Sequence, residues 1–201
     1  MSFRRHVRDQ VLRATRELTI KKGWDQVRMS EVAESVGVSR PTLYKEFGDK
    51  QGGLGDALVV SEGQRFMEGI LAVLAEHVGD VRGGITAAVQ FTLCEAEDSP
   101  LLKAVLTSNP SGNDRGGSSS TGVLPLLPTS ASLLQLCSAA LITWFNDHFD
   151  DLDPEDVEEV ADVFLVRLTV SHVVLPAADI ATTGERISRV ALRYLGVVHS
   201  L

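Results

Sequence analysis

Apolar residues recur at helical spacing through most of the chain. Val7, Val11, Ala14 and Leu18 repeat at intervals of four, three and four residues, which predicts an amphipathic helix over residues 4–22. Gly23 follows directly, and glycine favours the backbone conformation that ends a helix. We therefore expect the chain to begin with a long helix that presents one apolar face to a core.

Residues 30–50, SEVAESVGVSRPTLYKEFGDK, predict two short helices joined by a tight turn. Ser30 is placed to cap the first helix, and Gly37 supplies the left-handed turn that ends it. Ser39 is placed to cap the second helix. Pro41 fits the first turn of that helix because its missing N–H costs no hydrogen bond there.

The second short helix has a distinct inner and outer side. Leu43 and Phe47 lie four residues apart and are expected to point inward. In helix-turn-helix proteins the second helix lies in the major groove of DNA, where hydroxyls and cations contact base edges and phosphates. Such groups make up the expected outer side, which consists of Arg40, Thr42, Tyr44 and Lys45.

The first fifty residues resemble the DNA-binding domain of the TetR family of bacterial transcriptional regulators. The similarity covers VLRATRELTIKKGWDQVRM, with Gly23 and the aromatic Trp24, and is most specific in GVSRPTLYKEFGDK. By matching position, the resemblance implies DNA contacts from the residues at the start of the second helix, along the third helix and at the start of the fourth: Arg28, Ser30, Ser39, Arg40, Pro41, Thr42, Tyr44, Lys45 and Lys50.

Two features depart from the family pattern. Thr19 stands where the family usually has a large apolar residue, and Gly52, Gly53 and Gly55 crowd the start of the fourth helix. Each glycine inside a helix costs about 0.5–1 kcal/mol relative to alanine. We therefore expect an irregular junction after residue 50.

The rest of the chain also predicts helices, so the expected fold class is all-α. The predicted elements are a long fourth helix capped by Asp49 and reaching toward His77, a helix over 81–97, a short helix from Pro100, a mostly apolar and central helix over 130–149, a helix capped by Asp153 with Pro154 in its first turn, and a last helix over 183–198. The expected domains are a helix-turn-helix DNA-binding domain, residues 1–49, and a helical effector-binding and dimerisation domain, residues 50–201.

Residues 108–122, SNPSGNDRGGSSSTG, contain no apolar side chain. A segment of this composition cannot bury enough surface to offset the entropy lost on ordering. We expect a mobile loop, which is either a plain surface connection or a functional lid.

The last two predicted helices have broad apolar faces, and the resemblance implies that they pair across a two-fold axis as a four-helix bundle. The alternative is that they only complete the core of the monomer. A dimer is favoured because one recognition helix reads few base pairs. The expected interface residues are Val160, Val163, Phe164, Ile187, Val190, Ala191, Tyr194 and Leu195.

Charge is distributed unevenly along the chain. The whole chain carries a net charge of −8, whereas residues 1–50 hold eleven Lys and Arg against seven Asp and Glu, which gives +4 and leaves −12 for the remainder. A positive end on a negative body orients a protein toward a polyanion. The asymmetry agrees with a modular DNA-binding protein.

The sequence gives little support to several other classes of protein. No apolar run is long enough to span a membrane and the start lacks a secretory signal, so we expect a cytoplasmic protein without membrane association. No catalytic motif, cofactor fingerprint or zinc spacing is present, and neither an enzyme nor a cofactor is expected. The acidic residues Asp147, Asp150, Asp151 and Asp153 are better explained by hydration and capping than by metal binding. Cys94 and Cys137 are expected to be buried free thiols.

The resemblance also implies a small-molecule effector held within the second domain. An apolar or aromatic effector is expected in a cavity lined by Phe66, Met67, Ile70, Phe91, Cys94, Leu106, Trp144, Phe145 and His148, with His148 as a hydrogen-bonding group. The predicted function is a homodimeric repressor that the effector releases from double-stranded operator DNA. The alternatives are a DNA-binding protein that is constitutive or controlled by a partner, and an enzyme with a helix-turn-helix appendage.

Overall fold

The computed structural model describes residues 2–107 and 127–197, and within these ranges all regular elements are helical, which confirms the predicted fold class. The α-helices are α1 (Ser2–Lys22), α2 (Met29–Val36), α3 (Arg40–Phe47), α4 (Gly55–Ala75), α5 (Val81–Asp98), α6 (Pro100–Thr107), α7 (Leu127–His148), α8 (Pro154–Glu159), α9 (Leu168–Val174) and α10 (Ile180–Tyr194). A 3₁₀ turn covers Trp24–Gln26, a π turn covers Lys50–Leu54, and a longer π segment covers Val160–Arg167.

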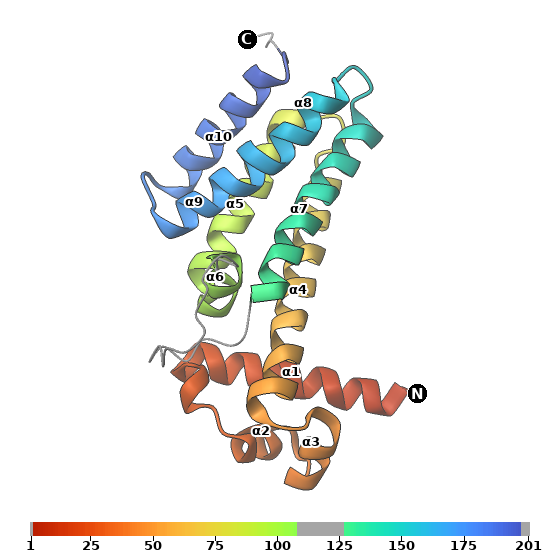
Figure 1. Cartoon of the computed structure of the whole chain (residues 1–201), viewed down its shortest axis with the longest axis vertical. Helices are drawn as coiled ribbons and strands as arrows, with labels where there is room; N and C mark the ends of the chain where they lie inside the picture. Colours follow the sequence, from red (N-terminus) through yellow and green to blue (C-terminus); the bar gives the residue numbers. More distant parts are fainter. Residues whose placement is uncertain (1, 108–126, 198–201) are drawn as a thin grey trace.

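The helices are arranged along one long axis (Figure 1). α1 crosses the molecule near one end, and α2 and α3 lie beyond it at that end. α4 runs from this end into a bundle formed with α5 to α10. A connected cluster of buried apolar side chains extends from Val11 in α1 and Leu43 in α3 to Leu192 in α10.

The caps of the first three helices largely follow the sequence. Gly37 ends α2 in the left-handed conformation, with φ of 70°. Ser39 caps α3, where its Oγ accepts a hydrogen bond from the backbone N–H of Thr42 at 3.2 Å. The prediction that Ser30 caps α2 is wrong: the capping position is Arg28, and the Glu31 carboxylate accepts its N–H at 3.0 Å. An acidic side chain three residues later therefore serves this helix start in place of a serine.

The junction before α4 is irregular, as the glycines predicted. The Asp49 carboxylate accepts from the backbone N–H of Gly52 at 2.7 Å, and the chain then makes its π turn. A Cβ on Gly53 would lie 1.3 Å from the carbonyl oxygen of Phe47. Glycine is required at residue 53 because the end of α3 passes directly over it.

The second half differs from the sequence-based expectation in three respects. The helix that Asp153 caps continues into the π segment and then α9, so it is not one regular helix. α10 begins at Ile180, with Asp179 accepting from the N–H of Thr182 at 2.9 Å, earlier than expected. α7 is not covered on all sides, since Leu136 is 56% exposed. The predicted loop 108–122 lies outside the described residues.

None of the described helices is long and apolar enough to cross a membrane. The described side chains form no group of three His, Cys, Asp or Glu that could hold a metal ion.

Candidate DNA interface and effector cavity

α3 lies at one end of the molecule (Figure 1). Leu43 and Phe47 are 1% and 6% exposed, so they fix the helix on the core and leave its other side free. Tyr44 is 49% exposed although it is aromatic. The structure brings together and exposes the six predicted contact residues of this helix and its cap: Ser39, Arg40, Pro41, Thr42, Tyr44 and Lys45.

The other three predicted DNA contacts flank this surface in sequence. Arg28 is exposed, and Ser30 and Lys50 are partly exposed. The Lys50 ammonium donates to the carbonyl oxygen of Asp25 at 3.2 Å and lies 4.8 Å from the centre of the Trp24 ring. Burial lowers the pKa of Lys50 below its ordinary value. An ammonium group has three donors, so Lys50 is held in place with donors left for a phosphate.

A cavity of about 40 Å³ lies within the helical bundle, between α4, α5, α6, α7, the π segment and α9. Its lining is mostly aliphatic, and three of the nine residues predicted to line an effector site belong to it: Phe66, Ile70 and Leu106. The full lining is Phe66, Ile70, Ile85, Ala88, Val89, Thr92, Leu106, Leu134, Cys137, Leu141, Leu165, Val166, Thr169 and Val170.

The other six predicted residues do not line this cavity. Phe91 stacks on Phe66, with 5.8 Å between the ring centres. Cys94 is exposed, which also corrects the expectation of a buried thiol. Phe145 is fully buried in the core. Met67, Trp144 and His148 line a separate surface groove of about 490 Å³ between α4 and α7.

His148, predicted as a hydrogen-bonding group of the effector site, lies at the surface groove and not at the cavity. Its Nδ1 is 2.9 Å from the carbonyl oxygen of Trp144 in its own helix. The indole N–H of Trp144 in turn donates to the carbonyl oxygen of Leu74 at 2.9 Å. Trp144 and His148 do lie on one face of a helix, as their spacing predicted, but this face of α7 borders the surface groove.

Sequence analysis missed the polar groups that do line the cavity. They are Thr92 on α5, Cys137 on α7 and Thr169 on α9. The Cys137 thiol donates to the sulfur of Met67 at 3.6 Å, and burial raises its pKa to about 12. The sequence signal for these groups was a threonine on an otherwise apolar helical face. This signal does not distinguish a residue in a cavity wall from one in a solid core.

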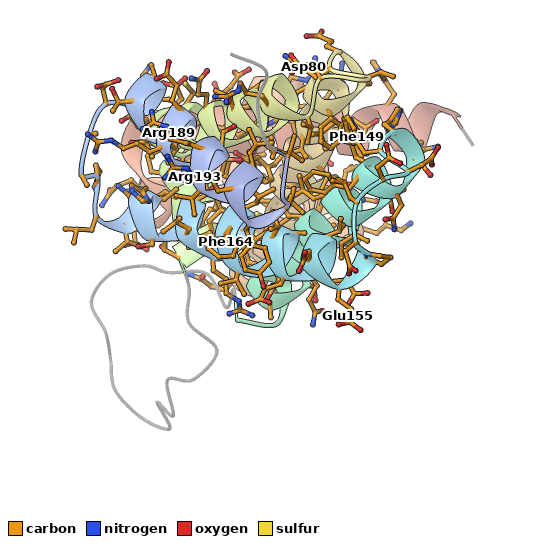
Figure 2. The ribbon with its side chains drawn as sticks, turned by 90° about the horizontal axis from the view of Figure 1, so that it is seen from above. Asp80, Phe149, Glu155, Phe164, Arg189 and Arg193 are labelled. Atoms are coloured by element: carbon orange, nitrogen blue, oxygen red, sulfur yellow. The ribbon has the colours of Figure 1, made fainter. Side chains whose placement is uncertain are left out.

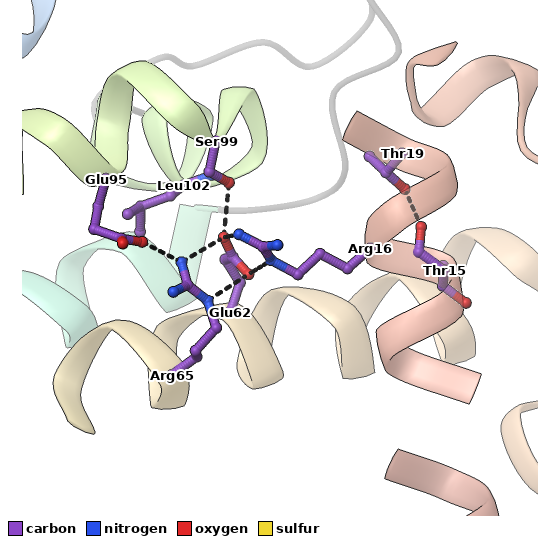
Figure 3. A network of polar contacts seen from close by, with 8 residues as sticks. All are labelled: Thr15, Arg16, Thr19, Glu62, Arg65, Glu95, Ser99 and Leu102. Carbon is purple, nitrogen blue, oxygen red and sulfur yellow. Dashed lines mark hydrogen bonds and ion pairs between the residues drawn. The ribbon is translucent and has the colours of Figure 1, made fainter. Parts of the chain in front are cut away.

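A polar network connects α1 to the helices that form the cavity (Figure 3). Glu62 on α4 is 1% exposed. Its carboxylate accepts from Arg16 of α1 at 2.7 Å and from the hydroxyl of Ser99, the residue before α6, at 2.7 Å. Arg65, one turn along α4, bridges Glu62 to Glu95 of α5. We call these five residues the Glu62 network.

The network keeps Glu62 ionised although it is buried. Burial alone would raise the pKa of Glu62, but hydrogen bonds from Arg16, Ser99 and Arg65 outweigh it and lower the pKa below its ordinary value. Ser99 Oγ also accepts from the N–H of Leu102 at 3.1 Å, so the same hydroxyl caps α6. One carboxylate therefore joins α1, α4 and α6.

The residues predicted to form a subunit interface fall into two groups. Val160, Ile187, Ala191 and Leu195 are buried inside the protomer, so they have no surface to offer a partner. Val163, Val190 and Tyr194 are exposed, and Phe164 is partly buried with its ring 5.1 Å from that of Tyr194. Figure 2 shows Phe164 with Arg189 and Arg193 on the side made by α10 and the π segment, away from Asp80 and Phe149.

Comparison with known families explains why these features occur together. A family model described as the bacterial regulatory proteins of the tetR family matches residues 11–52, and one described as the bacterial tetracyclin repressor C-terminal domain matches residues 80–193. The chain belongs to the TetR family. It is therefore a DNA-binding transcriptional regulator, of a family that is generally non-enzymatic.

Individual relatives agree with this assignment. The transcriptional regulator AlkX of Mycobacterium tuberculosis is 30% identical over 183 residues, which cover 87% of this chain and 82% of that protein. Among solved structures, the TetR family repressor AlkX from Dietzia sp. gives a TM-score of 0.65 at 24% identity and covers 94% of this chain and 97% of its own. A TetR-family regulator from Mesorhizobium loti gives 0.66 at 17% identity, covering 98% of both chains, and supports the fold alone.

Proposed function

We propose that this TetR-family regulator is a homodimeric repressor that a small, mostly apolar effector releases from operator DNA. The observation that carries the proposal is the Glu62 network, because it joins the DNA-binding part of the chain to the walls of the cavity. Arg16 belongs to α1, which packs against α2, whereas Glu62, Glu95 and Ser99 belong to or precede helices that line the cavity.

The exposed apolar residues on the π segment and α10 support the dimer. Val163, Val190 and Tyr194 are all more than a third exposed and lie on neighbouring elements. The flanking charges are complementary, because Arg186, Arg189 and Arg193 are exposed on α10 while Glu155, Glu158 and Glu159 are exposed on α8. A two-fold axis that sets α10 of one protomer beside α8 of its partner would pair opposite charges around an apolar centre.

The size of the cavity supports a mechanism in which the effector moves helices. Sites for drug-sized ligands have volumes of roughly 300–1,000 Å³, and this cavity measures about 40 Å³. An effector must therefore displace its walls, which include Phe66 on α4 and Leu106 on α6. Glu62 of α4 binds Arg16 of α1 directly, and Ser99, which caps α6, binds the same Glu62 carboxylate. Displacement of either helix therefore changes how α1, and with it the DNA-binding end of the molecule, is held.

The expected result is a change in the separation of the two recognition helices in the dimer. Operator affinity then falls by the effector's differential affinity for the two conformations. The relatives named AlkX, one of them a repressor implicated in biodegradation of n-alkanes, support an aliphatic effector.

A second candidate function is a DNA-binding protein with no small-molecule effector, either constitutive or controlled by a protein partner. The small volume of the cavity favours this alternative, because a nearly filled core needs no ligand. Thermal unfolding in the presence of an apolar compound library separates the two. A ligand at about a hundredfold excess over its dissociation constant adds about 2.7 kcal/mol of stability, whereas the alternative predicts no stabilising compound.

Gel-shift titration of the full chain tests the proposal. We expect it to bind a site in the DNA upstream of its own gene more tightly than scrambled DNA, as two protomers per site, and stabilising compounds to weaken that binding. Equal affinity for all sequences would reject the proposed operator recognition. A single protomer on the operator would reject the dimer, and compounds that stabilise the protein without changing DNA affinity would reject effector release.

A further inference from the structure

The hydroxyl group of Thr169, in the cavity wall, is buried without a hydrogen-bond partner. Thr169 is the one residue, among those whose side chains the structure describes, with a buried side-chain oxygen or nitrogen that has no hydrogen-bond partner. The residue is 4% exposed and its neighbours in the cavity lining are the aliphatic Val166 and Val170. A buried hydroxyl without a partner costs about 1–3 kcal/mol. A buried hydroxyl at this cost calls for an explanation.

Other helical threonines show how such a hydroxyl is ordinarily satisfied. Thr15, Thr19 and Thr92 each donate to the carbonyl oxygen four residues earlier, at 2.7–2.8 Å. Thr169 makes no such bond to Leu165, which lies in the π segment. The π segment changes the backbone register just before Thr169, and π-helical turns are frequent at functional sites.

The charge of the lining restricts what can bind. None of the described residues that line the cavity is acidic or basic. An ionised carboxylate or ammonium group in this cavity would be buried without a counter-charge, which is strongly unfavourable. A neutral group that accepts a hydrogen bond would instead give Thr169 the partner it lacks.

We infer that the effector is a neutral, mostly aliphatic molecule with one hydroxyl or carbonyl group, which bonds to the Thr169 hydroxyl. Thr92 supports the same class of ligand, because its hydroxyl hydrogen is used on Ala88 and its oxygen is left to accept. This inference rests on the proposed function, since it assigns the ligand of the proposed effector cavity. It excludes fatty-acid anions and amines as preferred ligands.

The test compares three six-carbon compounds, 1-hexanol, n-hexane and hexanoate, on the whole 201-residue chain. Each compound is applied at the same free concentration, below the solubility limit of n-hexane. Binding is measured from the shift in unfolding temperature and by competition between pairs of the three compounds. On the wild type, 1-hexanol should bind about tenfold more tightly than n-hexane, as expected for one neutral hydrogen bond to an otherwise unpaired group. Hexanoate should bind more weakly than 1-hexanol.

The variant Thr169→Val keeps the shape of the side chain and removes the hydroxyl. It should abolish the preference for 1-hexanol over n-hexane while n-hexane binds as before. Thr15→Val is the matched control, because it removes a buried hydroxyl in α1, outside the cavity. It should leave the ratio of the two affinities unchanged.

Three results would overturn the inference: tighter binding of hexanoate than 1-hexanol, an unchanged preference in Thr169→Val, or no binding by any of the three compounds. In each case the proposed function is judged separately by operator release in the wider compound screen. A charged or aromatic compound that releases the operator would leave the proposed function standing and reject this ligand class.

Discussion

Replacing Glu62 with glutamine perturbs most directly the contact between α1 and the helical bundle formed by α4 to α10. Gln has the same shape as Glu, so the change removes the charge with little change in packing. Arg16 loses its ionic partner, and the Ser99 hydroxyl loses its carboxylate acceptor. Arg65 keeps Glu95.

The expected cost follows from the burial of each partner. Removing one partner of a fully buried ion pair costs about 3–5 kcal/mol. Here the side chains of Arg16 and Arg65 are 28% and 37% exposed, so water can hydrate the released cations. The amide also still accepts one hydrogen bond. We therefore expect Glu62→Gln to lower the free energy of unfolding by about 2 kcal/mol, or the unfolding temperature by about 4–8 °C.

The pH dependence provides a second signature. The pKa of Glu62 in the folded protein lies below the ordinary value of 4.5. Its contribution is therefore present in full above that pH and is lost as the pH falls through the lowered pKa. The stability difference between wild type and Glu62→Gln should be largest near pH 7. It should shrink as the pH falls below about 4.5, where Glu62 of the unfolded wild type takes up a proton, and should vanish below the lowered pKa, where Glu62 of the folded protein is also neutral.

Urea unfolding at pH 7 and at pH 3.5 measures both effects. Glu95→Gln is the matched control, because it breaks the Arg65 pair between α4 and α5 and leaves Arg16 bound to Glu62. It should destabilise less and should keep the effect of a stabilising compound on operator affinity, which Glu62→Gln should largely remove. Equal stability of Glu62→Gln and wild type at pH 7, or an equal loss of response in both variants, would refute the reasoning.

Three further predictions concern other parts of the chain. Arg40→Ala should weaken operator binding and relax base preference, and unchanged discrimination among operators would restrict Arg40 to phosphate contact. Lys50→Ala should weaken binding to all DNA sequences alike. It should also reduce the slope of log affinity against log salt concentration by about one, which titrations at several salt concentrations would show. Gly53→Ala should lower the free energy of unfolding by at least about 2 kcal/mol because its Cβ would overlap the Phe47 carbonyl. Gly52→Ala, whose Cβ would come no closer than 3.4 Å to the Asp49 carboxylate, should cost under about 0.5 kcal/mol in the same urea titration. Val190→Glu should shift the protein toward monomers in sedimentation velocity runs, and a fully retained dimer would place the interface elsewhere.

The first three helices could be predicted well because their signals are local. Each of these signals acts within four residues: a helix cap, a proline in a first turn and a left-handed glycine. Ser39, Pro41 and Gly37 therefore define α3 and the turn before it without any tertiary contact. The error at Ser30 had the same local origin, since Glu31 offered Arg28 an equally good acceptor.

The effector cavity could not be predicted in the same way. Which face of α7 points inward depends on packing against α4 and α6, and this placed Cys137 in the cavity wall and His148 at the surface groove. The position of Thr169 depends on a π segment for which apolar periodicity gives no signal. Two partners of Glu62, Arg16 and Ser99, lie 46 and 37 residues away in the chain, so no sequence window connects them with it.

The central claim is that the exposed side of α3 enters a DNA groove once per protomer of a dimer. Hydroxyl-radical footprinting of the complex with its upstream DNA tests it most directly. We expect two protected segments related by two-fold symmetry, about one helical turn or a multiple of it apart, with both lost in the Arg40→Ala variant at the same protein concentration. A single protected segment, or protection that does not change in that variant, would contradict the claim.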